Sequence, residues 1–115
     1  MSDSAKTSEL ETDFDAREFS VLIVDNDKAH ARAMTESLER VGYRCTVATS
    51  GPEGIQQIEQ NMFHVVVTDL VMNDIDGMQV LQKAKASLPD CEVVLVTGHA
   101  TVPKAVEAMQ EGAFT

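Results

Sequence analysis

Apolar and polar residues along this chain predict short buried strands that alternate with amphipathic helices. Four short segments are predicted to be strands: 19–25, 43–48, 63–69 and 91–97. The first of them is a nearly continuous apolar run, which suits a strand buried on both faces. Between and after these segments, apolar residues recur at helical spacing. Four helices are predicted: one at about 28–41, one that begins at 51–54 and extends to Met62, one at about 78–88 and one at about 102–111.

Each predicted helix has one apolar stripe, which we expect to face the core. On this interpretation the methionines of the stripes are core residues. The stripes comprise Met34, Leu38 and Val41; Ile55, Ile58 and Met62; Met78, Leu81, Ala84 and Leu88; and Val102, Ala105, Val106 and Met109.

The alternation of strands and helices predicts an α/β fold with a doubly wound parallel sheet, because short right-handed crossovers connect parallel strands. We assign residues 19–115 to one globular domain, since 115 residues with 43% hydrophobic side chains suit a single core. Residues 1–18 are polar and acidic and are expected to form a disordered leader.

The net charge of −10 disfavours a nucleic-acid-binding surface, which needs clustered Lys and Arg. The leader contributes −4 of this charge. Because no run of 18 apolar residues is present, no membrane span is predicted. The acidic N-terminus resembles neither a signal nor a transit peptide, so a cytoplasmic location is expected. Cys45 and Cys91 lie in strand-like stretches without metal-ligand spacing and are interpreted as reduced thiols.

Polar side chains follow three of the predicted strands. Asp25, Asn26 and Asp27 come after the first strand, Asp69 ends the third, and Thr97 ends the fourth. The carboxyl ends of parallel strands meet at one edge of the sheet, where ligands bind in folds of this class. Crowded carboxylates repel one another, and a hard dication such as Mg²⁺ relieves this. A carboxylate can also attack phosphorus to form an acyl phosphate.

Several of these polar residues also have a purely structural interpretation. Asp27 suits the N-cap of the first helix, and Asp74 and Asp76 suit a turn in a glycine-containing loop. The histidines are scattered, so a histidine metal cluster is not predicted; they are His30, His64 and His99.

Three motifs in order resemble the receiver domains of two-component response regulators: VLIVDND (21–27), VVVTDLVMNDIDGMQVL (65–81) and VVLVTGHAT (93–101). The resemblance implies a flavodoxin-like receiver fold with strand order 2-1-3-4-5. The tract that begins at Gly98, GHATVPKAVEAMQEGAF, further resembles receivers of nitrogen-regulation transcription activators.

The resemblance also implies roles. Asp69 would accept a phosphoryl group from a sensor histidine kinase or a phosphotransfer protein, so the domain would not be a turnover enzyme. Mg²⁺ would be held by Asp25, Asn26, Asp69 and the backbone carbonyl of Val71. Thr97 would bond a phosphoryl oxygen and act as the switch, and dimerisation could follow phosphorylation.

The chain departs from the family pattern at three points. Asn26 stands where the family usually has a second Asp, so weaker Mg²⁺ binding is expected, and Asn73 replaces a Pro. The active-site Lys of the family would fall beyond Thr115. We therefore expect a C-terminally incomplete receiver with the fifth strand and helix truncated.

Two alternatives stay open at this point. Asp25 and Asp27 resemble the nucleophile and general acid of haloacid dehalogenase-like phosphatases, an interpretation that gives Asp69 no role. A pseudo-receiver that only binds partner proteins is the second alternative, because Asn26 and the missing Lys favour it. Within the receiver interpretation, apolar Val71 cannot orient an attacking water, which predicts a long-lived acyl phosphate.

Overall fold

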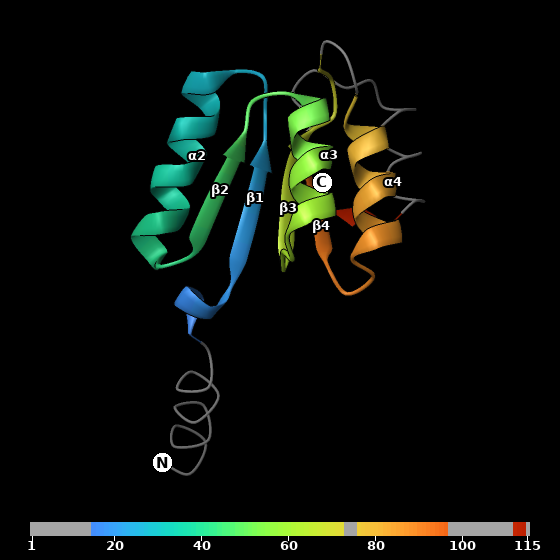
Figure 1. Ribbon diagram of the computed structural model, residues 1–115. Helices are drawn as coiled ribbons and strands as arrows, with labels where there is room; N and C mark the ends of the chain where they lie inside the picture. Colours follow the sequence, from blue (N-terminus) through green and yellow to red (C-terminus); the bar gives the residue numbers. More distant parts are fainter. Residues whose placement is uncertain (1–14, 73–75, 97–111, 115) are drawn as a thin grey trace.

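The protein forms a five-stranded parallel sheet, as a computed structural model describes it for residues 15–72, 76–96 and 112–114. The strand order is β2-β1-β3-β4-β5, so the predicted order is confirmed (Figure 1). The fifth strand is only two residues long. The strands are β1 (Ser20–Val24), β2 (Arg44–Ala48), β3 (Val65–Asp69), β4 (Glu92–Val96) and β5 (Ala113–Phe114).

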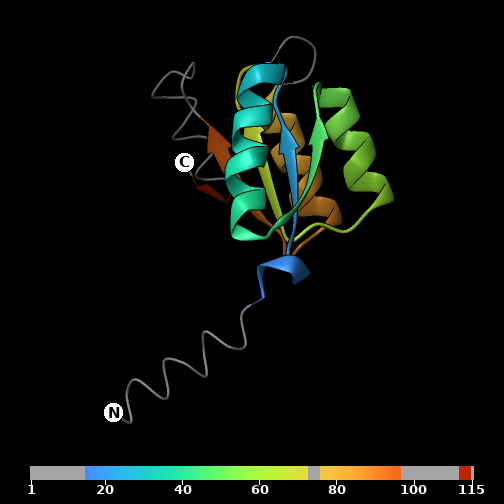
Figure 2. The same ribbon diagram turned by 90° about the vertical axis from the view of Figure 1, so that its left-hand side faces the viewer.

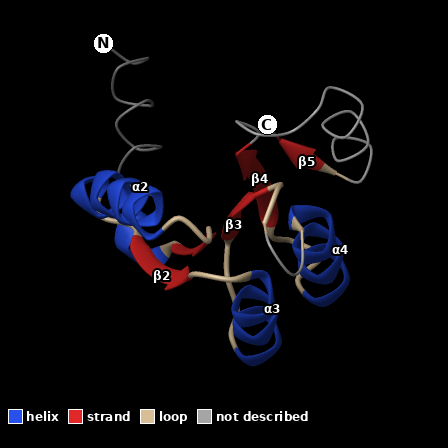
Figure 3. Ribbon diagram, turned by 90° about the horizontal axis from the view of Figure 1, so that it is seen from above, coloured by secondary structure: helices blue, strands red, loops and turns tan. Residues whose placement is uncertain are grey.

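Helices cover both faces of the sheet, as a doubly wound fold requires. Seen from above, α2 lies on one face, and α3 and α4 lie together on the other (Figure 3). A short 3-10 helix, η1, precedes β1. The helices span Ala16–Glu18 (η1), Lys28–Val41 (α2), Gly51–Gln60 (α3) and Gly77–Ser87 (α4). The helix predicted at about 102–111 lies outside the described residues.

Local side-chain chemistry sets where the helices begin and end. The Asp27 side chain accepts a hydrogen bond from the backbone N–H of His30, which confirms Asp27 as the N-cap of α2. Gly42 ends the same helix in the left-handed region, with φ of 116°. Asp76, which we expected to form a turn, is instead the N-cap of α4 and accepts from the N–H of Gln79.

The larger part of the core lies between the sheet and the pair α3 and α4. There Ile58, Met78, Leu81, Ala84 and Leu88 are buried, as predicted from the helical stripes. A smaller cluster lies under α2, which covers the other face of the sheet (Figure 2). There Val21, Ile23 and Ala31 are buried, and Met34 and Leu38 are partly buried against them.

Two residues predicted to be buried are exposed. Met62 is 79% exposed because α3 already ends at Gln60, so Met62 lies beyond the helix. Val41 is 63% exposed because it is the last residue of α2, immediately before the chain reverses at Gly42. The assignment of Met109 to the core falls outside the described residues.

The structure describes only part of the predicted leader, and it describes both cysteines. Residues 1–14 of the predicted leader lie outside the described part, so that disorder stays a prediction, while Arg17 is paired with Asp15. Cys45 and Cys91 are both free thiols. None of the described helices is sufficiently long and apolar to cross a bilayer.

Candidate functional site

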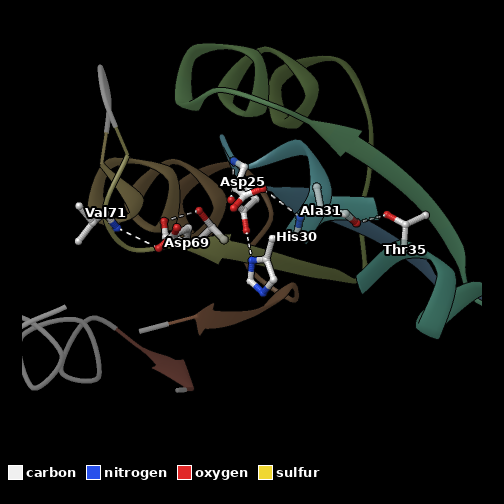
Figure 4. A network of polar contacts seen from close by, with 8 residues as sticks. Asp25, His30, Ala31, Thr35, Asp69 and Val71 are labelled. Carbon is white, nitrogen blue, oxygen red and sulfur yellow. Dashed lines mark hydrogen bonds and ion pairs between the residues drawn. The ribbon is translucent and has the colours of Figure 1, made fainter. Parts of the chain in front are cut away.

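Two aspartates stand next to each other where β1 and β3 end. Val24 and Thr68 are register partners in these parallel strands, and an aspartate follows each of them. Adjacent strands lie about 4.8 Å apart, so Asp25 and Asp69 occupy neighbouring positions at the same edge of the sheet (Figure 4). The predicted convergence of these two carboxylates is confirmed.

Asp25 is held by donors on both of its carboxylate oxygens. Its Oδ1 accepts a hydrogen bond of 2.9 Å from the N–H of Asp27, and its Oδ2 lies 2.5 Å from Nδ1 of His30. Its own N–H donates to the carbonyl of Ala48 on β2. Asp25 has no exposed surface, so it is a fixed component of the site.

Asp69 is held more loosely and retains a small exposed surface. Its Oδ1 accepts one hydrogen bond, of 3.2 Å, from the backbone N–H of Val71. The residue is 7% exposed. Of the two aspartates, only Asp69 therefore has solvent-exposed surface.

Backbone contacts hold Leu70, which follows Asp69, and Gly77 at the start of α4. The N–H of Leu70 donates to the carbonyl of Val96, and the N–H of Gly77 donates to the carbonyl of Leu70 at 2.8 Å. A Cβ at position 77 would lie 2.4 Å from the backbone oxygen of Asp69, so only glycine fits there. This close approach of α4 holds the acidic strand end in place.

The remaining predicted site residues surround this pair where the structure describes them. Asn26 is exposed in the loop after β1, and Val71 is 44% exposed. Val96 is the register partner of Asp69, and Thr97 is the next residue in the chain. Thr97 itself, like Asp74 and His99, lies outside the described residues.

The donor set fits a hard dication. Two buried aspartates end neighbouring strands, and Asn26, which is exposed, follows Asp25 directly in the chain. Oxygen ligands of this kind suit Mg²⁺, which retains several waters and binds one or two carboxylates. No group of three or more His, Cys, Asp or Glu side chains in the described residues forms a metal cluster. A site here therefore depends on the aspartate pair together with amide and backbone oxygens.

The sequence interpretation missed His30, which is in direct contact with Asp25. The available signal was its position: it lies five residues after the strand-ending aspartate and three after the N-cap, in the first turn of α2. His64 is far from this edge, since its Nδ1 accepts from the N–H of Ser20 at the start of β1.

Comparison with known proteins gives a consistent result. A family model for the response regulator receiver domain matches residues 21–115. The C4-dicarboxylate transport transcriptional regulatory protein DctD of Rhizobium meliloti (strain 1021) is 34% identical over 95 residues, which are 83% of this chain and 21% of DctD. The chain thus spans about a fifth of the length of the curated relatives it matches.

Solved structures agree with the fold. A CheY-like receiver domain protein from Methanospirillum hungatei JF-1 is 32% identical, with a TM-score of 0.79 over 83% of this chain and 76% of that one. A Burkholderia pseudomallei response regulator is 25% identical, with a TM-score of 0.77 over 83% and 56%. The beryllofluoride-activated NtrC4 receiver domain dimer is 34% identical, with a TM-score of 0.75 over 82% and 78%.

Proposed function

The chain belongs to the response regulator receiver domain family of two-component signalling, and on that basis we propose that Asp69 is its phosphoacceptor. The observation that carries the proposal is the aspartate pair at the ends of β1 and β3. Both carboxylates are buried, but Asp69 alone retains exposed surface. Asp69 can therefore act as the nucleophile, while Asp25 is fixed by its donors.

The proposed metal ligands are the carboxylates of Asp25 and Asp69, the amide oxygen of Asn26 and the backbone carbonyl of Val71. Mg²⁺ bound there would neutralise charge on the transferring phosphoryl group. The Burkholderia structure contains a phosphorylated aspartic acid and a calcium ion, which supports a dication beside the acceptor. Because a neutral amide replaces a carboxylate at Asn26, we expect a lower Mg²⁺ affinity.

In the proposed phosphoryl transfer, the residues of the chain orient the attacking carboxylate of Asp69. One oxygen of Asp69 accepts from the N–H of Val71, which orients the carboxylate so that its other oxygen can attack phosphorus. A P–O bond to Asp69 forms as the bond to the donor's leaving group breaks. A sensor histidine kinase or a phosphotransfer protein is the proposed donor, and the chain is not a turnover enzyme.

The output of the proposed reaction is a change of surface. A phosphoryl group adds negative charge at the sheet edge, and Thr97, next after the register partner of Asp69, is the proposed residue that bonds it. A phosphorylation-dependent dimer is the expected consequence, since the similar NtrC4 receiver is a dimer when activated by beryllofluoride. Transcription regulation would then belong to a DctD-like longer protein.

Intact-mass spectrometry after incubation with acetyl phosphate and Mg²⁺ tests the proposal. The wild-type chain should gain one phosphoryl group, and Asp69→Asn should gain none. Asp76→Asn is the matched control, because Asp76 is the nearby N-cap of α4 and should not affect the acceptor. A gain that persists in Asp69→Asn would contradict the assignment.

The same experiment addresses the alternatives. The phosphatase interpretation needs Asp27 as a general acid, but the Asp27 side chain caps α2. Transfer that depends on Asp69 and not on Asp27 excludes it. A folded wild-type chain that gains no mass from acetyl phosphate or from a phosphorylated histidine kinase would instead support the pseudo-receiver.

A further inference from the structure

His30 makes a contact that no role described so far requires. Its Nδ1 lies 2.5 Å from Oδ2 of Asp25, and the two side chains differ strongly in exposure. The His30 side chain is 44% exposed and that of Asp25 is 0% exposed. The histidine thus reaches from the surface to a buried carboxylate of the proposed metal site (Figure 4).

The helix start explains why the ring is in this position. Asp27 caps α2 by accepting from the backbone N–H of His30, which fixes the first turn of the helix relative to the end of β1. The cap uses only the backbone of His30. Replacing the ring therefore leaves the helix start intact and isolates the contact with Asp25.

The His30 ring gives Asp25 a partner that a cation would otherwise provide. Asp25 stands beside a second buried carboxylate, and its Oδ1 is already bonded to the N–H of Asp27. The His30 N–H directed at Oδ2 then occupies the remaining oxygen. Both the neutral ring with its proton on Nδ1 and the charged ring donate this bond, so the contact does not depend on the ring's charge.

An apolar groove beside His30 has space for the ring if it leaves Asp25. The ring lines this groove of about 480 Å³ beside α2, together with Val67, Val94 and Val96 of the sheet. Its partner Asp25 is fully buried at the end of a strand and cannot move away. A metal ion that binds Oδ2 at the lone pair bonded to the ring would therefore displace the histidine.

We infer that His30 competes with Mg²⁺ for the Asp25 carboxylate and so lowers the affinity of the site for the metal. The inference rests on the proposed function, because it takes Asp25 as a metal ligand. Mg²⁺ prefers oxygen ligands in a near-octahedral arrangement, so the displaced imidazole would not join its ligands. His30 is thus a positioning residue, because its ring is hydrogen-bonded to the Asp25 carboxylate when no metal is bound.

Binding of Mn²⁺ as a probe, followed by electron paramagnetic resonance of the free ion at one fixed pH, tests this. His30→Ala should bind Mn²⁺ about ten- to a hundredfold more tightly than wild type, which corresponds to removing one hydrogen bond to a charged group. His30→Asn places an N–H at the same distance along the side chain and should retain an affinity near that of wild type.

Two further variants control the measurement. Asp69→Asn should abolish binding, which locates the ion at this site. His64→Ala removes a histidine at the opposite end of β1 and should leave the affinity unchanged.

Equal or weaker binding by His30→Ala would overturn the competition while leaving the proposed function intact. Binding by His30→Ala alone, with none by wild type, would support the inference in its strongest form. Absence of Mn²⁺ binding in every variant would overturn both the inference and the proposed metal site.

Discussion

In the proposed reaction, Val71 controls how readily water hydrolyses phosphorylated Asp69. The residue is 44% exposed, and its backbone N–H bonds the Asp69 carboxylate, so its side chain stands at the edge of the site. A valine side chain cannot hydrogen-bond a water molecule, whereas an asparagine at the same position can orient one for attack on the acyl phosphate.

We therefore predict that phosphorylated Val71→Asn loses its phosphoryl group faster than wild type, by about tenfold or more. Decay of the phosphorylated mass after removal of the donor measures the rate. Val71→Ile, which changes the volume without adding a polar atom, should decay like wild type. Decay of Val71→Asn at the wild-type rate would refute the role given to this side chain.

The raised pKa values of the two cysteine thiols make the free energy of unfolding depend on pH. Burial raises the pKa of Cys91, and nearby Lys85 lowers it less. Burial also raises the pKa of Cys45, with a further contribution from Glu39. Since the folded thiols hold their protons more tightly than the unfolded ones, this stability is fully present below the ordinary thiol pKa of about 8.5 and is lost as pH rises through it towards the raised values.

Urea unfolding at increasing alkaline pH measures this loss. Wild type should lose stability more steeply above about pH 8.5 than the Cys91→Ala variant, which lacks the more deeply buried thiol. Alkylation should likewise modify Cys91 slowly in the folded chain and at an ordinary rate in urea. Identical pH slopes for the two proteins would contradict the role of burial at Cys91.

At the scale of the elements, local side-chain chemistry was sufficient to predict the ends of α2 but not the N-cap of α4, where Asp76 was expected to form a turn. The bounds of α2 were predicted because Asp27 and Gly42 mark its ends by short-range chemistry. The end of α3 was not, since the helix stops at Gln60 and Asn61 donates back to Gln57 with no glycine to mark the stop. The contact of His30 with Asp25 was missed because it depends on how α2 is oriented relative to β1.

The approach of α4 to β3 can be tested at Gly77. A Cβ there would lie 2.4 Å from the oxygen of Asp69 and 2.6 Å from Cα of Leu70, and both are backbone atoms. Gly77→Ala should lower the free energy of unfolding by about 3 kcal/mol, because the strand end must move. Gly54→Ala, whose Cβ would lie 2.8 Å from the side chain of fully buried Val24, should cost less, because its three nearest atoms belong to a side chain and not to the backbone.

Urea unfolding of the two alanine variants provides the comparison. Gly77→Ala should also weaken Mn²⁺ binding, whereas Gly54→Ala should not, since only the former displaces Asp69. Equal losses of stability with unchanged metal binding would contradict the claim that α4 positions the site.

At the scale of the whole molecule, the sheet brings together residues that are 44 positions apart in the chain. The strand-and-helix pattern was sufficient to predict this, because parallel strands place their carboxyl ends at one edge and Val24 pairs with Thr68. The difference in burial between Asp25 and Asp69 could not be predicted in this way. It depends on the loops and helices that cover each strand end.

We propose that Asp25 and Asp69 form one site that a single cation stabilises. A double-mutant cycle with Asp25→Asn, Asp69→Asn and the double variant, measured by urea unfolding, tests it most directly. With a chelator present, the coupling between the two carboxylates should be unfavourable by about 1 kcal/mol, because like charges stand on neighbouring strands. With saturating Mg²⁺, the coupling should become favourable. A coupling near zero under both conditions would show that Asp25 and Asp69 do not share one cation site.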